Sequence, residues 1–151
     1  MAYIEQNLIV GENVIYRAKL HWIIFQWTII WFAISMICFS GNVNSAGIIF
    51  LALAIVLGIF RILDYTTSEF GVTNKRVLIK VGWAQRRSLE LLLTKIESIA
   101  VVQDLQGKML GYGTIIITGT GGSKEVFPSI TNPFEFRMKL QEQISNVQES
   151  K

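Results

Sequence analysis

The sequence predicts an α+β membrane protein, in which a transmembrane hairpin of two helices follows the first strand of an antiparallel sheet. Residues 22–60 contain no charged side chain and no histidine. Short segments of alternating apolar and polar residues lie on both sides of this run, and an amphipathic segment ends the chain. Charged residues make up only 17% of the 151 residues, whereas about 25% is usual in a soluble domain.

The first strand is predicted immediately before the uncharged run. Val14, Tyr16, Ala18 and Leu20 occupy alternate positions, which is the period of a β-strand. We therefore expect residues 1–21 to form an N-terminal segment that contributes one strand to the folded domain and then leads directly into the membrane.

The uncharged run is long enough for two spans, because a spanning helix needs about 20 mostly apolar residues. Its middle, "SGNVNSAG", is rich in turn-forming residues. We predict a transmembrane hairpin over residues 22–63, with helices at about 22–39 and 46–63. The second helix is short unless the side chain of Arg61 extends toward the lipid headgroups.

Two other interpretations of the run are a buried hairpin in a soluble core and a cleavable signal peptide. So small a protein could not surround two helices that are apolar on all sides. The segment before the run is long for a signal peptide and contains Glu5 and Glu12, and a second apolar segment follows directly. A permanent membrane hairpin is therefore favoured.

The distribution of charge predicts how the hairpin is oriented. Arg17 and Lys19 precede the first helix and Arg61 ends the second, while the connecting loop is uncharged. The positive-inside rule then predicts that both termini are cytoplasmic. Cys38 is the single cysteine and lies within the first helix, so an intrachain disulfide is impossible.

Residues 64–147 are predicted to form a cytoplasmic domain, and residues 148–151 a polar tail. Asn74 and Lys75 fit a two-residue turn, because asparagine tolerates a positive φ. The segment "DLQGKMLGYG" is expected to be a longer loop with one helical turn. Six further strands are predicted at 65–73, 76–81, 86–92, 96–103, 114–118 and 124–127.

The chain is predicted to end in a helix. Asn132 is a suitable N-cap, Pro133 suits the first helical position, and Glu135 would complete a capping box. An apolar stripe then repeats at helical spacing and is expected to face the core; it consists of Phe136, Leu140, Ile144 and Val147.

Seven antiparallel strands closed by a C-terminal helix are the plan of a pleckstrin-homology (PH) domain. The segments "TSEFGVTNKRVLIK", "SLELLLTKIESIAV", "LGYGTIIITGTGG" and "NPFEFRMKLQEQI" resemble those of small bacterial PH-domain membrane proteins. The resemblance covers nearly the whole chain and is most specific in "VTNKRV" and "LGYGT". It implies a PH-like barrel, joined to a two-helix anchor in the bacterial cytoplasmic (inner) membrane. It brings no established catalytic residues.

A basic segment at residues 71–90 is the main candidate for a site. Successive connections in an antiparallel meander alternate between the two ends of the sheet. Counted from the helical hairpin, connections 82–84 and 119–123 are expected at the membrane end. A tryptophan beside cations is typical of an interfacial anchor, and each basic residue near anionic lipid contributes about 1 kcal/mol. The residues predicted to contact headgroups of the anionic leaflet are Lys80, Trp83, Arg86, Arg87 and Lys124.

A plainer interpretation of these charges remains open. Alternation places Val77 and Ile79 on one face of their strand, and Arg76 and Lys80 on the other. These cations would then be ordinary solvated positions on the outer face of a sheet.

Gln26 is a candidate for a helix–helix contact, because an amide in hydrocarbon prefers a partner on a neighbouring helix. The contact could lie within the hairpin or between subunits. The glycine-rich segment "GYGTIIITGTGGSKE" lacks the order of a phosphate-binding loop, and the only histidine, His21, has no companion ligands for zinc. We predict no catalytic residue, metal, cofactor or nucleic-acid partner.

The function expected from these observations is a non-enzymatic, membrane-anchored interaction or scaffold module. It would assemble with itself as a homo-oligomer or bind other membrane proteins at the cytoplasmic face of the membrane, with its basic end against the lipids. Two alternatives are a small oligomeric channel or transport accessory subunit, and a sensor of lipid headgroups.

Overall fold

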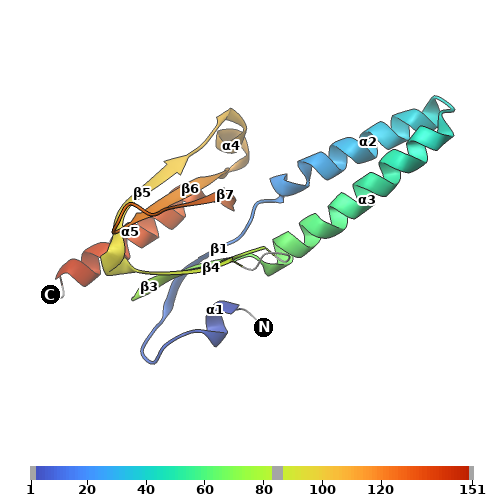
Figure 1. Cartoon of the computed structure of the whole chain (residues 1–151). Helices are drawn as coiled ribbons and strands as arrows, with labels where there is room; N and C mark the ends of the chain where they lie inside the picture. The colour runs from blue at the N-terminus through green and yellow to red at the C-terminus, as the bar shows by residue number, and fades with distance from the viewer. Residues whose placement is uncertain (1–2, 83–86, 150–151) are drawn as a thin grey trace.

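The structure is a computed structural model that describes residues 3–82 and 87–149 (Figure 1). Two antiparallel sheets form a sandwich, from one end of which a pair of long helices projects. The elements are, in order, α1 (Tyr3–Gln6), β1 (Val14–Ala18), η1 (Trp22–Phe25), α2 (Gln26–Ser40), α3 (Asn44–Thr67), β2 (Glu69–Thr73), β3 (Arg76–Val81), β4 (Arg87–Leu92), η2 (Leu93–Lys95), β5 (Ile96–Val102), α4 (Leu105–Leu110), β6 (Tyr112–Gly119), β7 (Lys124–Thr131) and α5 (Pro133–Glu149).

The predicted strands are present, but they are divided between two sheets, β1-β2-β3-β4 and β5-β6-β7. The expectation of one continuous barrel is therefore corrected. The chain passes from one sheet to the other through the 3-10 turn η2, and the extension of β1 joins the sheets by an isolated bridge between Leu20 and Ile130. Two backbone hydrogen bonds support this bridge, from Thr131 to Lys19 at 3.0 Å and from His21 to Ser129 at 2.7 Å.

The core lies between the sheets because alternate strand residues point inward. Phe70 and Phe127 meet across it edge to face, with ring centroids 6.0 Å apart. Helix α5 closes one side, where Phe136 packs edge to face on Tyr16 at 6.2 Å. The predicted stripe on α5 is confirmed: Phe136 and Leu140 are fully buried, and Ile144 and Val147 pack on the core from its margin.

The start of α5 differs from the predicted capping box. The backbone N–H of Asn132 donates to the carbonyl of Gly111 at 2.9 Å rather than to Glu135. The Glu135 carboxylate instead accepts from the Tyr16 hydroxyl at 3.1 Å. This contact, together with burial, raises the pKa of Tyr16 to about 12. A tertiary hydrogen bond has thus replaced the local cap.

Helices α2 and α3 form the predicted antiparallel hairpin, with a shorter break and a longer second helix than expected. The break is confined to residues 41–43, and α3 continues through residues 65–67, which had been assigned to the next strand. Ser35 is fully buried between the helices, where its hydroxyl donates to the carbonyl of Gly47 at 2.8 Å. A Cβ at Gly47 would lie 3.0 Å from the ring of Phe39, so glycine permits this close approach.

Both helices leave the same end of the sandwich, which we call the hairpin end. There β1 leads into η1, and α3 leads into β2 through the single residue Ser68. The opposite end, called the far end, carries the Asn74–Lys75 turn and η2. Two helical segments, Trp22–Ser40 (η1 followed by α2) and Asn44–Thr67 (α3), are long and apolar enough to cross a membrane, and only 11% of each apolar window is buried in the chain.

The N-terminal segment covers the outer face of the first sheet, which the sequence did not indicate. Ile4 of α1 is buried against Gly71, where an added Cβ would lie 2.7 Å from the Ile4 side chain. Leu78 on the same outer face is fully buried. Alternation along β3 is therefore no guide to exposure here.

Candidate functional site at the hairpin end

The connections at the hairpin end differ in part from those predicted. Strand β3 ends at Val81 and β4 begins at Arg87 at this end, which is the end expected for the connection between them. The 119–123 turn does not: Thr120 donates to the carbonyl of Lys95 in η2 at 2.8 Å, which places it at the far end. The connections at η2 and at α4 both precede this turn, so the turn is the sixth connection from the helical hairpin, and the segment containing α4, the fifth, occupies the hairpin end instead. Lys124, which follows the 119–123 turn, is consequently not part of the site.

The other predicted basic residues have different environments. Lys80 is partly buried, and its ammonium group lies 4.8 Å from the centre of the Tyr3 ring, a cation–π contact. Arg87 begins β4 at the hairpin end, opposite Val81. Trp83 and Arg86 lie outside the described residues.

Arg76 is not a solvated cation, contrary to the interpretation from alternation. Its guanidinium donates from Nε to a Glu12 carboxylate oxygen at 3.0 Å and also contacts Glu90. The Glu12 side chain is fully buried, and it accepts a hydrogen bond from Thr73 at 2.7 Å. This cluster attaches the N-terminal segment to the sheet near the far end. The sequence carried no signal for it, because Glu12 lies outside every regular element.

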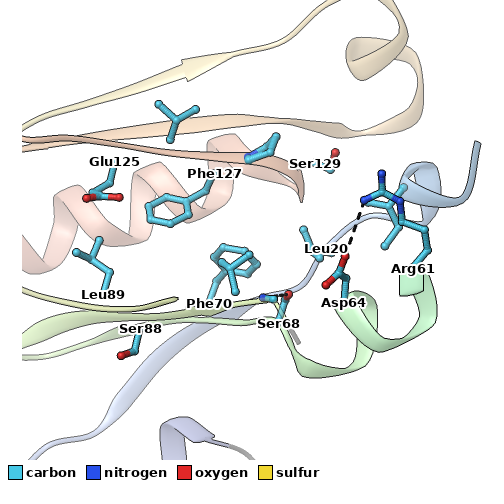
Figure 2. A pocket seen from close by; sticks show the side chains of 15 residues that line it. Leu20, Arg61, Asp64, Ser68, Phe70, Ser88, Leu89, Glu125, Phe127 and Ser129 are labelled. Atoms are coloured by element: carbon cyan, nitrogen blue, oxygen red, sulfur yellow. Dashed lines mark hydrogen bonds and ion pairs between the residues drawn. The ribbon is translucent and has the colours of Figure 1, made fainter. Parts of the chain in front are cut away.

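A pocket of about 620 Å³ opens between the sheets toward the hairpin (Figure 2). Phe70 and Phe127 form its apolar interior together with Leu89, and Figure 2 shows Leu20 between them and the helices. Arg61 and Asp64 project from the end of α3 at its rim, with 3.9 Å between guanidinium and carboxylate. An apolar interior with opposite charges at its rim has the chemistry to hold an amphiphile with a zwitterionic headgroup.

The sequence alone did not reveal this pocket. Its lining comes from η1, α3, β2, β3, β4 and β7 and from the link between β1 and η1, which are distant along the chain. From the sequence, Arg61 was singled out only as a residue that could extend toward headgroups, not as part of a pocket.

His21 joins the start of the helical hairpin to the second sheet. Its ring is stacked on Tyr112 at 5.1 Å, and its Nδ1 accepts from the backbone of Ile23 at 3.2 Å. Burial lowers the pKa of His21 and outweighs the opposing effect of its hydrogen bond to the backbone of Leu110. The imidazole is therefore neutral at neutral pH. His21 thus packs on Tyr112 and accepts a hydrogen bond from the start of η1.

Gln26 is the first residue of α2 and is exposed on the single chain. Ser35, in contrast, is satisfied between the two helices by Gly47. The exposed amide of Gln26 could therefore contact another subunit, whereas Ser35, nine residues further along the helix, bonds within the hairpin. Within residues 3–82 and 87–149, no three His, Cys, Asp or Glu side chains gather as metal ligands would.

A family model described as the bacterial PH domain matches residues 14–148. The chain belongs to the bacterial PH-domain family. The match runs from β1 into the last turn of α5 and includes the helical hairpin, so the inserted helices lie within the matched region. No curated protein matches the sequence significantly. The PH-like architecture of this bacterial PH-domain protein, with antiparallel sheets and a C-terminal helix, thus agrees with the resemblance of its segments.

Proposed function

We propose that this bacterial PH-domain protein is a non-enzymatic, membrane-anchored interaction module. Its helical hairpin spans the cytoplasmic membrane and holds the PH-like sandwich at the cytoplasmic surface. The observation that carries the proposal is the outward apolar surface of α2 and α3, of which little is buried by the rest of the chain. Contiguous apolar surface of this size on a soluble monomer would cause association, whereas lipid covers it.

Short connections keep the sandwich close to the bilayer in this arrangement. Ser68 alone separates α3 from β2, and its backbone N–H donates to the carbonyl of Asp64 at 3.1 Å. On the other side, the buried His21 immediately precedes η1. Because both connections are short and ordered, the hairpin end of the sandwich faces the headgroups. The basic residues near the hairpin support a cytoplasmic position for both termini.

The partners proposed for this module are a second copy of the chain or other membrane proteins. The outward surface of the hairpin is available for helix contacts in the bilayer, where an amide such as that of Gln26 gains from a partner across the interface. Anionic lipids of the cytoplasmic leaflet are the second partner, through cations close to the hairpin such as the exposed Lys19.

The anchoring is tested by extraction and by cysteine labelling in a Cys38→Ser background. We expect the protein to resist carbonate extraction. A cysteine at Asn42, in the hairpin loop, should react with a membrane-impermeant maleimide on intact spheroplasts. A cysteine at Lys124, exposed at the far end, should react only after lysis. Release by carbonate, or labelling at Lys124 in intact spheroplasts, would contradict the proposal.

A lipid-headgroup ligand is a second candidate function, favoured by the pocket at the hairpin end. The Arg61–Asp64 pair at the rim can match the phosphate and ammonium groups of a zwitterionic phospholipid, and the Phe70–Phe127 interior can receive part of its acyl chain. The pocket lies where α3 enters the sandwich, so a lipid could reach it from the adjacent leaflet.

The pocket predicts a difference between two tryptophan substitutions on β4. Leu89→Trp places an indole in the pocket, whereas Leu92→Trp adds the same ring at a position that is 52% exposed and outside it. Native mass spectrometry of the detergent-solubilised protein with phosphatidylethanolamine should show severalfold lower lipid occupancy for Leu89→Trp alone. Equal occupancy in both variants would rule out this pocket as the lipid site.

A further inference from the structure

Helix α4 carries apolar side chains that the rest of the chain leaves exposed. Leu105 is 76% exposed and Met109 is 80% exposed, although both are large and apolar. They are four residues apart and therefore share one face of the helix. Gly107 is buried on another face, where an added Cβ would lie 2.5 Å from the carbonyl oxygen of Tyr112. The helix is thus seated on β6 by Gly107, with Leu105 and Met109 turned outward.

The outward face of α4 is held in place rather than loosely collapsed. The Asp104 side chain caps the helix by accepting from the backbone of Gly107 at 2.6 Å. Gly111 ends it in the left-handed conformation at φ 78°, with its N–H donating to the carbonyl of Gly107 at 2.8 Å. The Gln103 amide donates to the carbonyl of Tyr112 at 2.7 Å. With both ends capped, the exposure of Leu105 and Met109 is a property of the fold.

The position of α4 relative to the hairpin decides what can cover this face. His21, the residue before η1, hydrogen-bonds the backbone of Leu110 and stacks on Tyr112. Figure 1 shows α4 beyond the ends of β5 and β6, on the side of the sandwich from which α2 starts. Next to His21, Trp22 is 51% exposed. The apolar face of α4 is therefore close to the level at which the chain passes into the apolar helices.

We propose that α4 is a second, interfacial membrane contact, which inserts Leu105 and Met109 into the boundary between headgroups and acyl chains of the leaflet next to the sandwich. This inference rests on the proposed spanning of the hairpin. Lys108 is exposed on the same short helix and would lie among the lipid phosphates. Amphipathic helices with this combination of apolar and basic residues lie in the plane of the interface.

A contact at α4 would change what the anchor does for the domain. With the hairpin as its only contact, the sandwich can still tilt together with the hairpin relative to the bilayer normal. A second membrane contact at α4, on the sheet formed by β5, β6 and β7, would restrict the tilt of the sandwich relative to the bilayer. The sandwich would then present the same surfaces to its partners in every molecule.

The test places an environment-sensitive fluorophore at Met109→Cys in a Cys38→Ser background, with the full chain reconstituted in vesicles of phosphatidylethanolamine and phosphatidylglycerol. Quenching by spin-labelled lipid and by aqueous iodide is compared at three positions. Ile37→Cys, 70% exposed on α2, reports on the hairpin, and Lys124→Cys reports on the far end. We expect the Met109 probe to be quenched by lipid severalfold more than the Lys124 probe and to be protected from iodide.

Two outcomes would overturn the inference alone, with the Ile37 probe still quenched by lipid. Equal iodide quenching at Met109 and Lys124 would place α4 in water. Protection of Met109 from both quenchers would show that a protein surface covers it. Absence of lipid quenching at Ile37 would instead contradict the proposed function, and the inference would fall with it.

A second variant tests the same contact without a probe on α4. In Leu105→Asp, with the fluorophore at Ile37, hairpin insertion should be unchanged. With the fluorophore at Met109, iodide quenching should rise severalfold, because a charged side chain beside it opposes insertion. Unchanged iodide quenching at Met109 would contradict an interfacial position for α4.

Discussion

Replacing Arg76 with methionine is expected to lower the free energy of unfolding of the PH-like domain by about 3–5 kcal/mol, because removal of one member of a buried ion pair leaves the other charge uncompensated. The Glu12 carboxylate is fully buried and would lose the hydrogen bonds from the guanidinium. Urea unfolding in detergent micelles, followed by circular dichroism, measures the loss.

A matched control is available in Arg17→Met. Arg17 is also paired with a carboxylate, that of Glu5 at 2.8 Å, but the side chains of Arg17 and Glu5 are 44% and 58% exposed. An exposed pair contributes at most about 1 kcal/mol. Equal losses in the two variants would show that burial of the Arg76–Glu12 pair does not determine its contribution.

The same pair predicts how acid affects stability. Burial alone would raise the pKa of Glu12, but hydrogen bonds from Arg76, the backbone of Ile9 and Thr73 outweigh it, so the pKa is lowered below its ordinary value of 4.5. A lowered pKa in the folded state means that the contribution is present above pH 4.5 and is lost as the pH falls through the folded value. In Arg76→Met, the free energy of unfolding should therefore depend less on pH below 4.5 than it does in the unaltered protein.

Phe136→Ala is the second large expected effect. Phe136 lies on the inward face of α5, where it is fully buried and packs on Tyr16. Its truncation therefore leaves a cavity where α5 closes the sandwich. Truncation of a buried phenylalanine typically costs about 3–5 kcal/mol. Thermal unfolding in micelles should show the loss, together with faster proteolysis of the C-terminal helix.

Phe134→Ala provides the control on the same helix. Phe134 is 55% exposed two positions earlier, so its truncation removes the same atoms with little change in burial. Its effect is expected to stay within about 0.5 kcal/mol. Comparable losses at positions 134 and 136 would contradict the assignment of the inward face of α5.

The secondary structure was largely predictable because its signals are local. Alternation identified the strands, and the uncharged run with its turn-rich middle identified the two helices. Errors occurred where tertiary contacts replaced local ones. Glu135 would have completed a capping box by its spacing, but the Tyr16 hydroxyl recruits its carboxylate. Residues 65–67, an aromatic and two β-branched side chains, are typical of a strand, yet α3 continues through them before β2 begins.

The candidate site was predicted only in part, because its residues meet through topology. The end of β3 and the start of β4, Val81 and Arg87, lie at the end of the sheet that was expected. Lys124 was misplaced because the connection between the fourth and fifth strands, which η2 forms, was not counted as a reversal of the chain. The reversal brings α4 to the hairpin end, and α4 had been expected only as a helical turn in a loop.

Composition and periodicity by themselves determined that two apolar helices interrupt a seven-stranded antiparallel fold, and that an amphipathic helix ends the chain. These properties depend on the order of side chains within single segments. Only the tertiary structure decided that the outer face of β3 is covered, that a pocket opens beneath α3, and that α4 lies beside the start of the hairpin. Each depends on distant residues, as in the hydrogen bond between Arg76 and Glu12 across 64 positions, and no local pattern encodes such a contact.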